Sequence, residues 1–312
     1  MESLRHRLGK LLPHQEVPPI RKAVFELVKN LLEWRVTDSW NEENSWLLEG
    51  RTVLIYKGGD RKDPANYGRV TCFPTITKMV MLAINKRMRR WLFGSVEASI
   101  LECEQRGVRA SHDCKEAVLE NFAFNQMKKG KRETIELCHD FQKAYDNVNL
   151  DFLDELLNVY GFPLETQMLI IEMMARWKIR LSYGARKEVG EVRLKNVIIQ
   201  GDAFSPLLFD VMIDPFIKIL KKCVGDDTEV LYYMYDLKAS TSSIEKAVTV
   251  HEIVKRYAAS VGMVVNKKKS ATQLNVETPL PESLQDIPRI DALTYKDLGF
   301  KMKKGDWKEG MG

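Results

Sequence analysis

Apolar and polar residues alternate along this chain with two different periods, and each period predicts its own kind of element. Apolar residues recur every three to four positions in AVFELVKNLLEW (23–34) and in TITKMVMLAINKRMRRWLFG (75–94), which predicts amphipathic helices. The Pro-Pro pair of EVPPI precedes the first of these stretches and favours a helix start there. RTVLIYKGG (51–59) instead favours a strand that ends in a glycine turn.

From Thr134 onward, strand patterns alternate with helix patterns. The predicted strands are 134–141, a hairpin over 179–194, a strand pair around Asp236, and 263–270. The predicted helices are 149–161, 164–178, 204–222 and 243–262. Helices interspersed with antiparallel hairpins are typical of α+β domains. We therefore predict an α+β fold, and we find no internal repeat.

Two of the predicted strands carry a carboxylate inside an apolar run. EVLYYMYDLKAS (229–240) contains Asp236, and ETIELCHDF contains Asp140. A carboxylate is costly to bury without a cationic or hydrogen-bonding partner. Two strands that bring acids into one cleft suggest a divalent metal site, because Mg²⁺ is held by a few carboxylate oxygens together with substrate phosphates.

Four motifs follow one another in an order that carries a family resemblance. They are TVLIYKGGDRKDPANYGRVTCFPT, LCHDFQKAYD, VIIQGDAFSPLLF and YYMYDLK. In this order they resemble the reverse transcriptases of non-LTR (LINE-type) retrotransposons, over about Trp46 to Phe300. The resemblance implies a right-hand polymerase fold with fingers (46–133) and a palm built on an antiparallel sheet (134–300), and we expect the helical thumb that follows the palm in the family to be absent here. A helical lead-in (1–45) and a frayed tail (301–312) complete the expected organisation.

The resemblance also implies a reaction, which is template-directed DNA synthesis by nucleotidyl transfer with two Mg²⁺ ions. Its partners would be an RNA template, a DNA primer and dNTPs. Asp140 and Asp236 take the place of the metal ligands, and Lys269 takes the place of the lysine that protonates or stabilises the leaving pyrophosphate.

Substrate-binding residues carry over from the same motifs. Lys57 would meet the triphosphate, and Tyr145 would be an aromatic gate against a ribose 2′-hydroxyl. The loop-to-helix motif would line the templating base and the incoming nucleotide through Gln200, Gly201, Ser205 and Pro206. The hairpin that grips the primer end corresponds to YKDLGF, with Tyr295, Leu298 and Gly299.

The chain departs from the family pattern at three of these places. Tyr235 stands where the family has the first of two adjacent acids, and a phenol is neutral at pH 7. We expect Asp236 to reach the metal site only if the hairpin slips or bulges by one residue, because neighbouring strand residues point to opposite faces. Arg69 is one residue out of register with the family's arginine, and Asp297 replaces an apolar residue. We therefore predict little or no polymerase activity.

Other acids in the chain have simpler interpretations. Asp146 fits a helix-entry residue better than a metal ligand. Asp226 and Asp227 follow Gly225 in a Gly-Asp-Asp triplet, which is a metal signature in RNA-dependent RNA polymerases. A basic helix precedes the triplet here, so we interpret it as a polar turn between helix and strand. Two other functions stay open, a nucleic-acid-binding module without chemistry and a non-functional remnant of a retroelement.

Composition narrows the class of protein. The 312 residues are 45% hydrophobic, enough to bury a core, and 48 Lys and Arg against 43 Asp and Glu give a net charge of +5. Basic clusters such as NKRMRRW and NKKKS fit nucleic-acid binding only if they converge on one groove. Five cysteines without metal-ligand spacing indicate reduced thiols and no structural zinc. We expect a soluble intracellular protein, nuclear or cytoplasmic, with no membrane span and no signal peptide.

Overall fold

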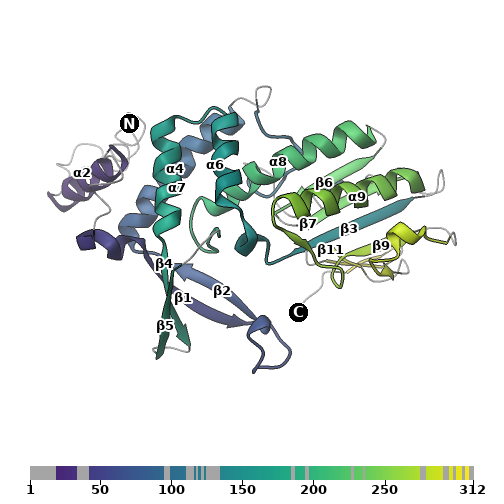
Figure 1. The fold of residues 1–312 in the computed structure, drawn as a ribbon, viewed down its shortest axis with the longest axis horizontal. Coiled ribbons are helices and arrows are strands. Elements are labelled where there is room, and N and C mark those ends of the chain that lie inside the picture. The colour runs from purple at the N-terminus through teal and green to yellow at the C-terminus, as the bar shows by residue number, and fades with distance from the viewer. Residues whose placement is uncertain are drawn as a thin grey trace.

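The structure is a computed structural model with an α+β architecture (Figure 1). It describes residues 19–33, 42–94, 99–109, 116, 119–120, 123, 134–183, 187–193, 197–225, 228–234, 236–274, 279–290, 295–297, 300–303 and 306–308. Two sheets carry most of the strands, and the helices gather beside and above them. The α+β class predicted from the sequence is therefore confirmed.

The large sheet has its strands in the order β10-β9-β3-β7-β6. These strands are β3 (Ile135–Gln142), β6 (Glu229–Tyr233), β7 (Asp236–Thr241), β9 (Ala271–Leu274) and β10 (Arg289–Ile290). The short β8 (Val264–Val265) pairs with the end of β3. β3 is central and paired along both edges, which explains why almost its whole length is buried. The strand predicted over 263–270 is shorter than expected, because a turn follows β8 directly.

Two helices cover one face of the large sheet, α8 (Ser205–Val224) and α9 (Ile244–Ser260) (Figure 1). Phe216 of α8 is buried and meets Tyr232 of β6 edge-on, with ring centroids 6.2 Å apart. The same ring lies 5.2 Å from Tyr257 of α9. These three aromatic residues join both helices to the sheet.

A second group of helices stands beside this layer. α6 (Leu150–Val159) contacts both α8 and α7 (Leu164–Arg176), and α2 (Pro19–Glu33) contacts α4 (Thr75–Phe93). Their apolar stripes supply core residues such as Met81 and Ile170, which are fully buried. All four helices were predicted from periodicity, and α2 begins at the proline that suggested its start. Short 3₁₀ helices occupy Glu42–Leu48, Pro64–Asn66, Ala144–Asn147 and Glu282–Leu284.

The small sheet has the order β2-β1-β4-β5. Its strands are β1 (Glu49–Tyr56), β2 (Tyr67–Cys72), β4 (Lys178–Tyr183) and β5 (Lys187–Arg193). The hairpin predicted over 179–194 is present, but β4 runs parallel to β1 and so joins the sheet of the earlier segment. The predicted division between residues 133 and 134 assigns this hairpin to the palm segment, although its partner strand β1 lies in the fingers segment. Parallel partners distant in sequence leave no local pattern, which is why periodicity did not reveal the pairing.

A backbone contact ties the small sheet to the loop that precedes α8. Thr71 of β2 donates its N–H to the carbonyl oxygen of Gln200 at 2.9 Å. Gly201 has φ of +109°, and a Cβ built there would lie 2.4 Å from the Thr71 carbonyl oxygen. Only glycine combines this backbone conformation with so close an approach.

The last described residues form a third sheet. It pairs β11 (Tyr295–Asp297) with β12 (Phe300–Lys303), and β12 with β13 (Asp306–Lys308). The prediction of a frayed tail is therefore wrong for 301–303 and 306–308. The alternation of apolar and lysine residues in FKMK is a strand pattern. The strand pairs with β11 and β13, although the glycines of the segment had favoured an unpaired tail.

Candidate active site

Asp140 and Asp236 are direct neighbours across two strands of the large sheet. β3 and β7 run antiparallel, and their register pairs Asp140 with Asp236. Directly opposed residues project from the same face of a sheet, with Cβ atoms about 4.5–5.5 Å apart. The two predicted metal ligands therefore come together.

The hairpin between β6 and β7 is short and in register. Tyr233 pairs with Asp236, so the connection consists of residues 234 and 235. Met234 has φ of +56°, a conformation that two-residue hairpin turns require. The expectation that Asp236 would need a slip or a bulge to reach Asp140 is therefore wrong, because the acid next to the turn is already opposite Asp140. Tyr235 itself lies outside the described residues.

The carboxylate of Asp140 is held by the turn that follows β8. Asn266 donates a side-chain N–H to Oδ2 of Asp140 at 2.8 Å, and Nζ of Lys269 lies 4.0 Å from the same oxygen. Burial raises the pKa of the Asp140 carboxyl, although Lys269, Asn266 and Lys57 each act to lower it. The structure thus places the predicted Lys269 beside the predicted metal ligand.

Lys57 approaches the same acid from the end of β1. Its ammonium is close enough to act on the pKa of Asp140. Its side chain lies across Gly68, where a Cβ would come within 2.4 Å of Lys57 Cε. Gly68 therefore leaves the space through which Lys57 reaches toward the acids.

Arg69 makes an ion pair with Asp146. Both side chains are partly exposed, at 42% and 29%. Arg69 comes from the small sheet and Asp146 from the 3₁₀ turn after β3, so the ion pair links the two parts of the chain. The predicted substrate-binding Arg69 is thus engaged with an acid of this chain, and Asp146 has a structural partner.

Tyr145 lies under the same hairpin turn. Its ring stacks on Phe209 of α8 at 5.1 Å between centroids and 9° between planes. Its hydroxyl is 3.9 Å from the sulfur of Met234. The stacking fixes the orientation of the ring, which a steric gate requires, and burial leaves 7% of the residue exposed.

The loop-to-helix motif is organised by an acid that the sequence analysis passed over. Asp202 is buried and accepts hydrogen bonds from the backbone N–H groups of Phe204 and Ser205, both at 2.7 Å, and from the Ser205 hydroxyl. Burial raises the pKa of its carboxyl to about 6, against the lowering effect of these hydrogen bonds. Ser205 and Pro206 therefore form the first turn of α8, and Gln200 is exposed beside them.

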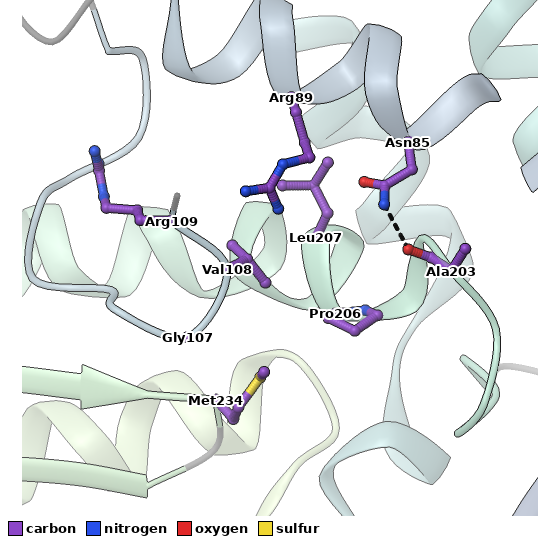
Figure 2. Close-up of a pocket in the computed structure, with 9 residues that line it drawn as sticks. All are labelled: Asn85, Arg89, Gly107, Val108, Arg109, Ala203, Pro206, Leu207 and Met234. Carbon is purple, nitrogen blue, oxygen red and sulfur yellow. Dashed lines mark hydrogen bonds between the residues drawn. The ribbon is translucent and has the colours of Figure 1, made fainter. Parts of the chain in front are cut away.

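A pocket of about 280 Å³ opens between this helix start and the hairpin turn (Figure 2). Pro206, Leu207 and Met234 are among its apolar lining residues, and Asn85 and Arg89 project from α4 toward it. Asn85 donates to the carbonyl oxygen of Ala203 at 2.7 Å. The pocket thus combines an apolar wall with a cationic one, next to the strand end that carries Asp236.

Several predicted positions lie at or beyond the edge of what the structure describes. Tyr295 is in β11, whereas Leu298 and Gly299 of the predicted primer grip lie outside the described residues. Asp226 and Asp227 lie outside them too, between α8 and β6. Within the described part of the chain, no three acids, histidines or cysteines gather as a metal site, and the four described cysteines are free thiols.

Two contributors to the site were missed in the sequence. Asn266 was included in a strand and Asp202 was not singled out. Asp202 had a signal, since an acid three residues before a helix-starting Ser-Pro can accept hydrogen bonds from the backbone at that helix start. Asn266 had none, because its contact with Asp140 spans 126 positions of sequence.

Among the described helices, none is long and apolar enough to cross a membrane.

Comparison with known proteins identifies the group to which these features belong. Residues 60–302 match the family described as "Reverse transcriptase (RNA-dependent DNA polymerase)". The matched stretch covers most of the chain and includes Asp140, Asp236 and Lys269.

Two curated relatives are retrovirus-related Pol polyproteins from type-1 retrotransposable element R2. The protein from Popillia japonica is 22% identical over 231 residues, which cover 71% of this chain and 31% of that protein. The protein from Nasonia vitripennis is 26% identical over 276 residues, which cover 81% of this chain and 26% of that protein. The chain therefore spans a third or less of the length of both relatives.

Solved structures with a similar fold include two telomerases. The telomerase of Candida albicans, in complex with a TWJ fragment of telomeric RNA, has a TM-score of 0.60 at 10% identity, over 86% of this chain and 46% of that one. The apo telomerase of Candida tropicalis has a TM-score of 0.59 at 13% identity, over 92% of this chain and 53% of that one. At these identities the likeness concerns the fold.

Proposed function

Since this chain belongs to the reverse transcriptase (RNA-dependent DNA polymerase) family, we propose that it is a template-directed DNA polymerase domain whose catalysis is strongly impaired by Tyr235. In this proposal the small sheet and α4 are the fingers, and the large sheet with α8 and α9 is the palm. The substrates are an RNA template, a DNA primer and dNTPs. The in-register pair of Asp140 and Asp236, directly beside the turn that contains Tyr235, carries the proposal.

The residues around the acid pair have distinct tasks. Asp140 and Asp236 would hold Mg²⁺, whose carboxylate preference fits this donor pair. When bound, Mg²⁺ would stabilise the attacking 3′-oxygen and the leaving pyrophosphate. Lys57 would bind the triphosphate, and Lys269 would meet the pyrophosphate from the side of Asp140. The stacked ring of Tyr145 would exclude a 2′-hydroxyl.

Tyr235 weakens this arrangement for an electrostatic reason. The family's acid at this position would give the turn a third carboxylate, whereas a tyrosine is neutral at pH 7. The two remaining acids share their surroundings with the ammonium groups of Lys57 and Lys269, both of which act on Asp140. A divalent cation would therefore be held by fewer charges than the chemistry needs, and affinity for it would fall.

Primer extension tests the proposal. The chain and its Tyr235→Asp variant would be given an RNA template, a DNA primer, dNTPs and Mg²⁺. We expect the variant to extend the primer at least about 100-fold faster, because restoring a ligand should exceed the roughly 10- to 100-fold effect of supporting residues. Tyr235→Phe is the matched control and should stay as slow as the parent. A parent chain that extends as fast as Tyr235→Asp would refute the proposal.

The cations at the site favour one alternative, association with nucleic acid without chemistry. Lys57 is exposed, and the side chain of Lys269 is 74% exposed, so both can meet phosphates even where metal binding is weak. Such binding would weaken with salt and would not be strengthened by Mg²⁺. Filter binding of labelled RNA with and without Mg²⁺ distinguishes it from the proposed polymerase.

A further inference from the structure

The turn from Asn266 to Ser270 surrounds Asp140 with hydrogen bonds. The N–H of Asn266 donates to the Asp140 carbonyl oxygen at 2.8 Å, and the N–H of Asp140 donates to the Ser270 hydroxyl at 3.2 Å. The turn is closed on itself, since Ser270 donates its N–H to the Asn266 carbonyl oxygen at 2.8 Å. The backbone of Asn266 is therefore fixed relative to Asp140 before any side chain is considered.

The side chain of Asn266 makes a separate contact on this rigid base. Its amide Nδ2 lies 2.8 Å from Oδ2 of Asp140. A carboxylate only accepts hydrogen bonds, so the amide must present its N–H₂ side to it. A short side chain on a fixed backbone has few rotamers, and this hydrogen bond selects one of them.

Lys269 competes for the same oxygen. Its Nζ is 4.0 Å from Oδ2, at the outer limit of an ion pair, and its side chain is largely exposed. Among the described residues, the side-chain contacts of this carboxylate fall on Oδ2, which leaves Oδ1 to another ligand. Without the Asn266 amide, the carboxylate could turn toward the ammonium and form a closer ion pair, which would oppose a cation.

We infer that Asn266 is a positioning residue, whose amide fixes the rotamer of Asp140 so that Oδ1 stays available to a divalent cation beside Asp236. The inference rests on the proposed function, because it takes the acid pair to be the metal site. It assigns to Asn266 a task that its side chain performs and its backbone does not. Loss of the amide should therefore weaken metal binding more than it weakens the fold.

The test uses Mn²⁺ as the probe, with the bound fraction followed by EPR. The parent is the full chain with Tyr235→Asp, and the variants on this parent are Asn266→Ala and Asn266→Leu, which keeps the branched shape of asparagine without its hydrogen-bonding atoms. Asn147→Ala is the matched control, since Asn147 is also partly buried and donates its amide to a backbone carbonyl, that of Gln142 at 3.0 Å. Melting temperature is measured for each variant.

We expect both Asn266 variants to weaken Mn²⁺ binding about 10-fold or more, the usual effect of losing a group that orients a metal ligand. Asn147→Ala should change it less than about twofold. Primer extension on the same parent should lose kcat while KM for dNTP is kept, because the amide does not contact the nucleotide.

The outcomes separate the two claims. If the Tyr235→Asp parent binds no Mn²⁺, the proposed function fails and the inference fails with it. If the parent binds Mn²⁺ and both Asn266 variants bind it equally well, only the inference is overturned. Equal weakening by Asn266→Ala, Asn266→Leu and Asn147→Ala would also overturn it, since that pattern indicates general loosening.

Discussion

The two faces of β3 differ in how their polar groups are used. Asp140 projects from one face, which we call the acid face, and the neighbouring His139 projects from the opposite, helix-covered face, which we call the histidine face. On the histidine face, Nε2 of His139 lies 2.9 Å from Nδ1 of His251 in α9, and Nε2 of His251 lies 2.7 Å from Asp286. These polar groups pair with one another, whereas within the described part of the chain the side-chain contacts of Asp140 are confined to Oδ2.

The two faces also respond to pH with opposite signs. Burial, and then the neighbouring His251, lowers the pKa of His139 to about 3. A lowered histidine pKa contributes stability that is present above about pH 6.5 and is lost as the pH falls. Burial raises the pKa of Asp140, so its effect on stability is most favourable in acid and is lost as the pH rises through that pKa. The histidine face therefore favours folding at neutral pH, and the acid face opposes it there, as functional sites often do.

Asp140→Asn should produce the largest effect and separate function from stability. On the Tyr235→Asp parent we expect primer extension to fall more than about 100-fold, since a metal ligand is lost. We also expect the melting temperature at pH 7 to rise, because the amide carries no charge to desolvate. Glu155→Gln, at an exposed position of α6, is the control. A variant that is less stable than its parent at pH 7 would contradict the claim that the buried charge of Asp140 opposes folding.

Acidification should reveal the histidine face. Between pH 7 and pH 5 the unsubstituted chain should lose about 2 kcal/mol of unfolding free energy through His139. This is the amount expected for a histidine whose pKa is about 6.5 in the unfolded chain and about 3 in the folded one. His139→Gln can keep a hydrogen bond to His251 without titrating. Urea unfolding at pH 7, 6 and 5 measures both proteins. Parallel pH curves for the two would show that His139 is protonated in the folded state.

Asp286→Asn should have the smallest effect. Its carboxylate is partly exposed and also pairs with Lys267 at 3.2 Å, where screening by water keeps an ion pair near 0–1 kcal/mol. An asparagine oxygen can still accept from His251. We expect less than about 1 kcal/mol in chemical unfolding and no change in Mn²⁺ affinity. A clear loss of Mn²⁺ affinity would mean that the two faces are coupled through the strand.

The sequence was sufficient for most of the elements and for the family. The helices α2, α4, α6, α7, α8 and α9 lie where apolar periodicity predicts them, and the reverse transcriptase resemblance from non-LTR elements is confirmed. Helix periodicity is a local property, so a single sequence contains it. The roles of the individual site residues remain predictions.

Long-range pairing could not be predicted in the same way. The parallel pairing of β1 with β4 and the register of Asp140 with Asp236 depend on contacts between distant segments. From the sequence, Asp236 is expected to be one position out of place, because it follows a missing acid. Position 235 belongs to the two-residue turn, so β7 begins at Asp236, which lies directly opposite Asp140.

Arg69 and Gly201 illustrate why a motif does not fix a contact. Arg69, which stands one residue out of register with the family pattern, pairs with Asp146. From its motif, Asp146 is predicted only as a helix-entry residue. Gly201 is predicted to line the templating base and the incoming nucleotide, and in the structure its backbone comes close to the Thr71 carbonyl oxygen. The residue type was informative in both cases, while the partner depended on the fold.

The crossing of Gly201 over Thr71 limits how this domain can be recombined. A chimaera that takes the small sheet from one relative and α8 from another would be cut through this crossing. A donor with any side chain at the glycine position would bring a Cβ against a carbonyl oxygen, where no rotamer change can relieve the clash. In a chimaera, strand β2 and the 200–201 loop should therefore come from the same relative.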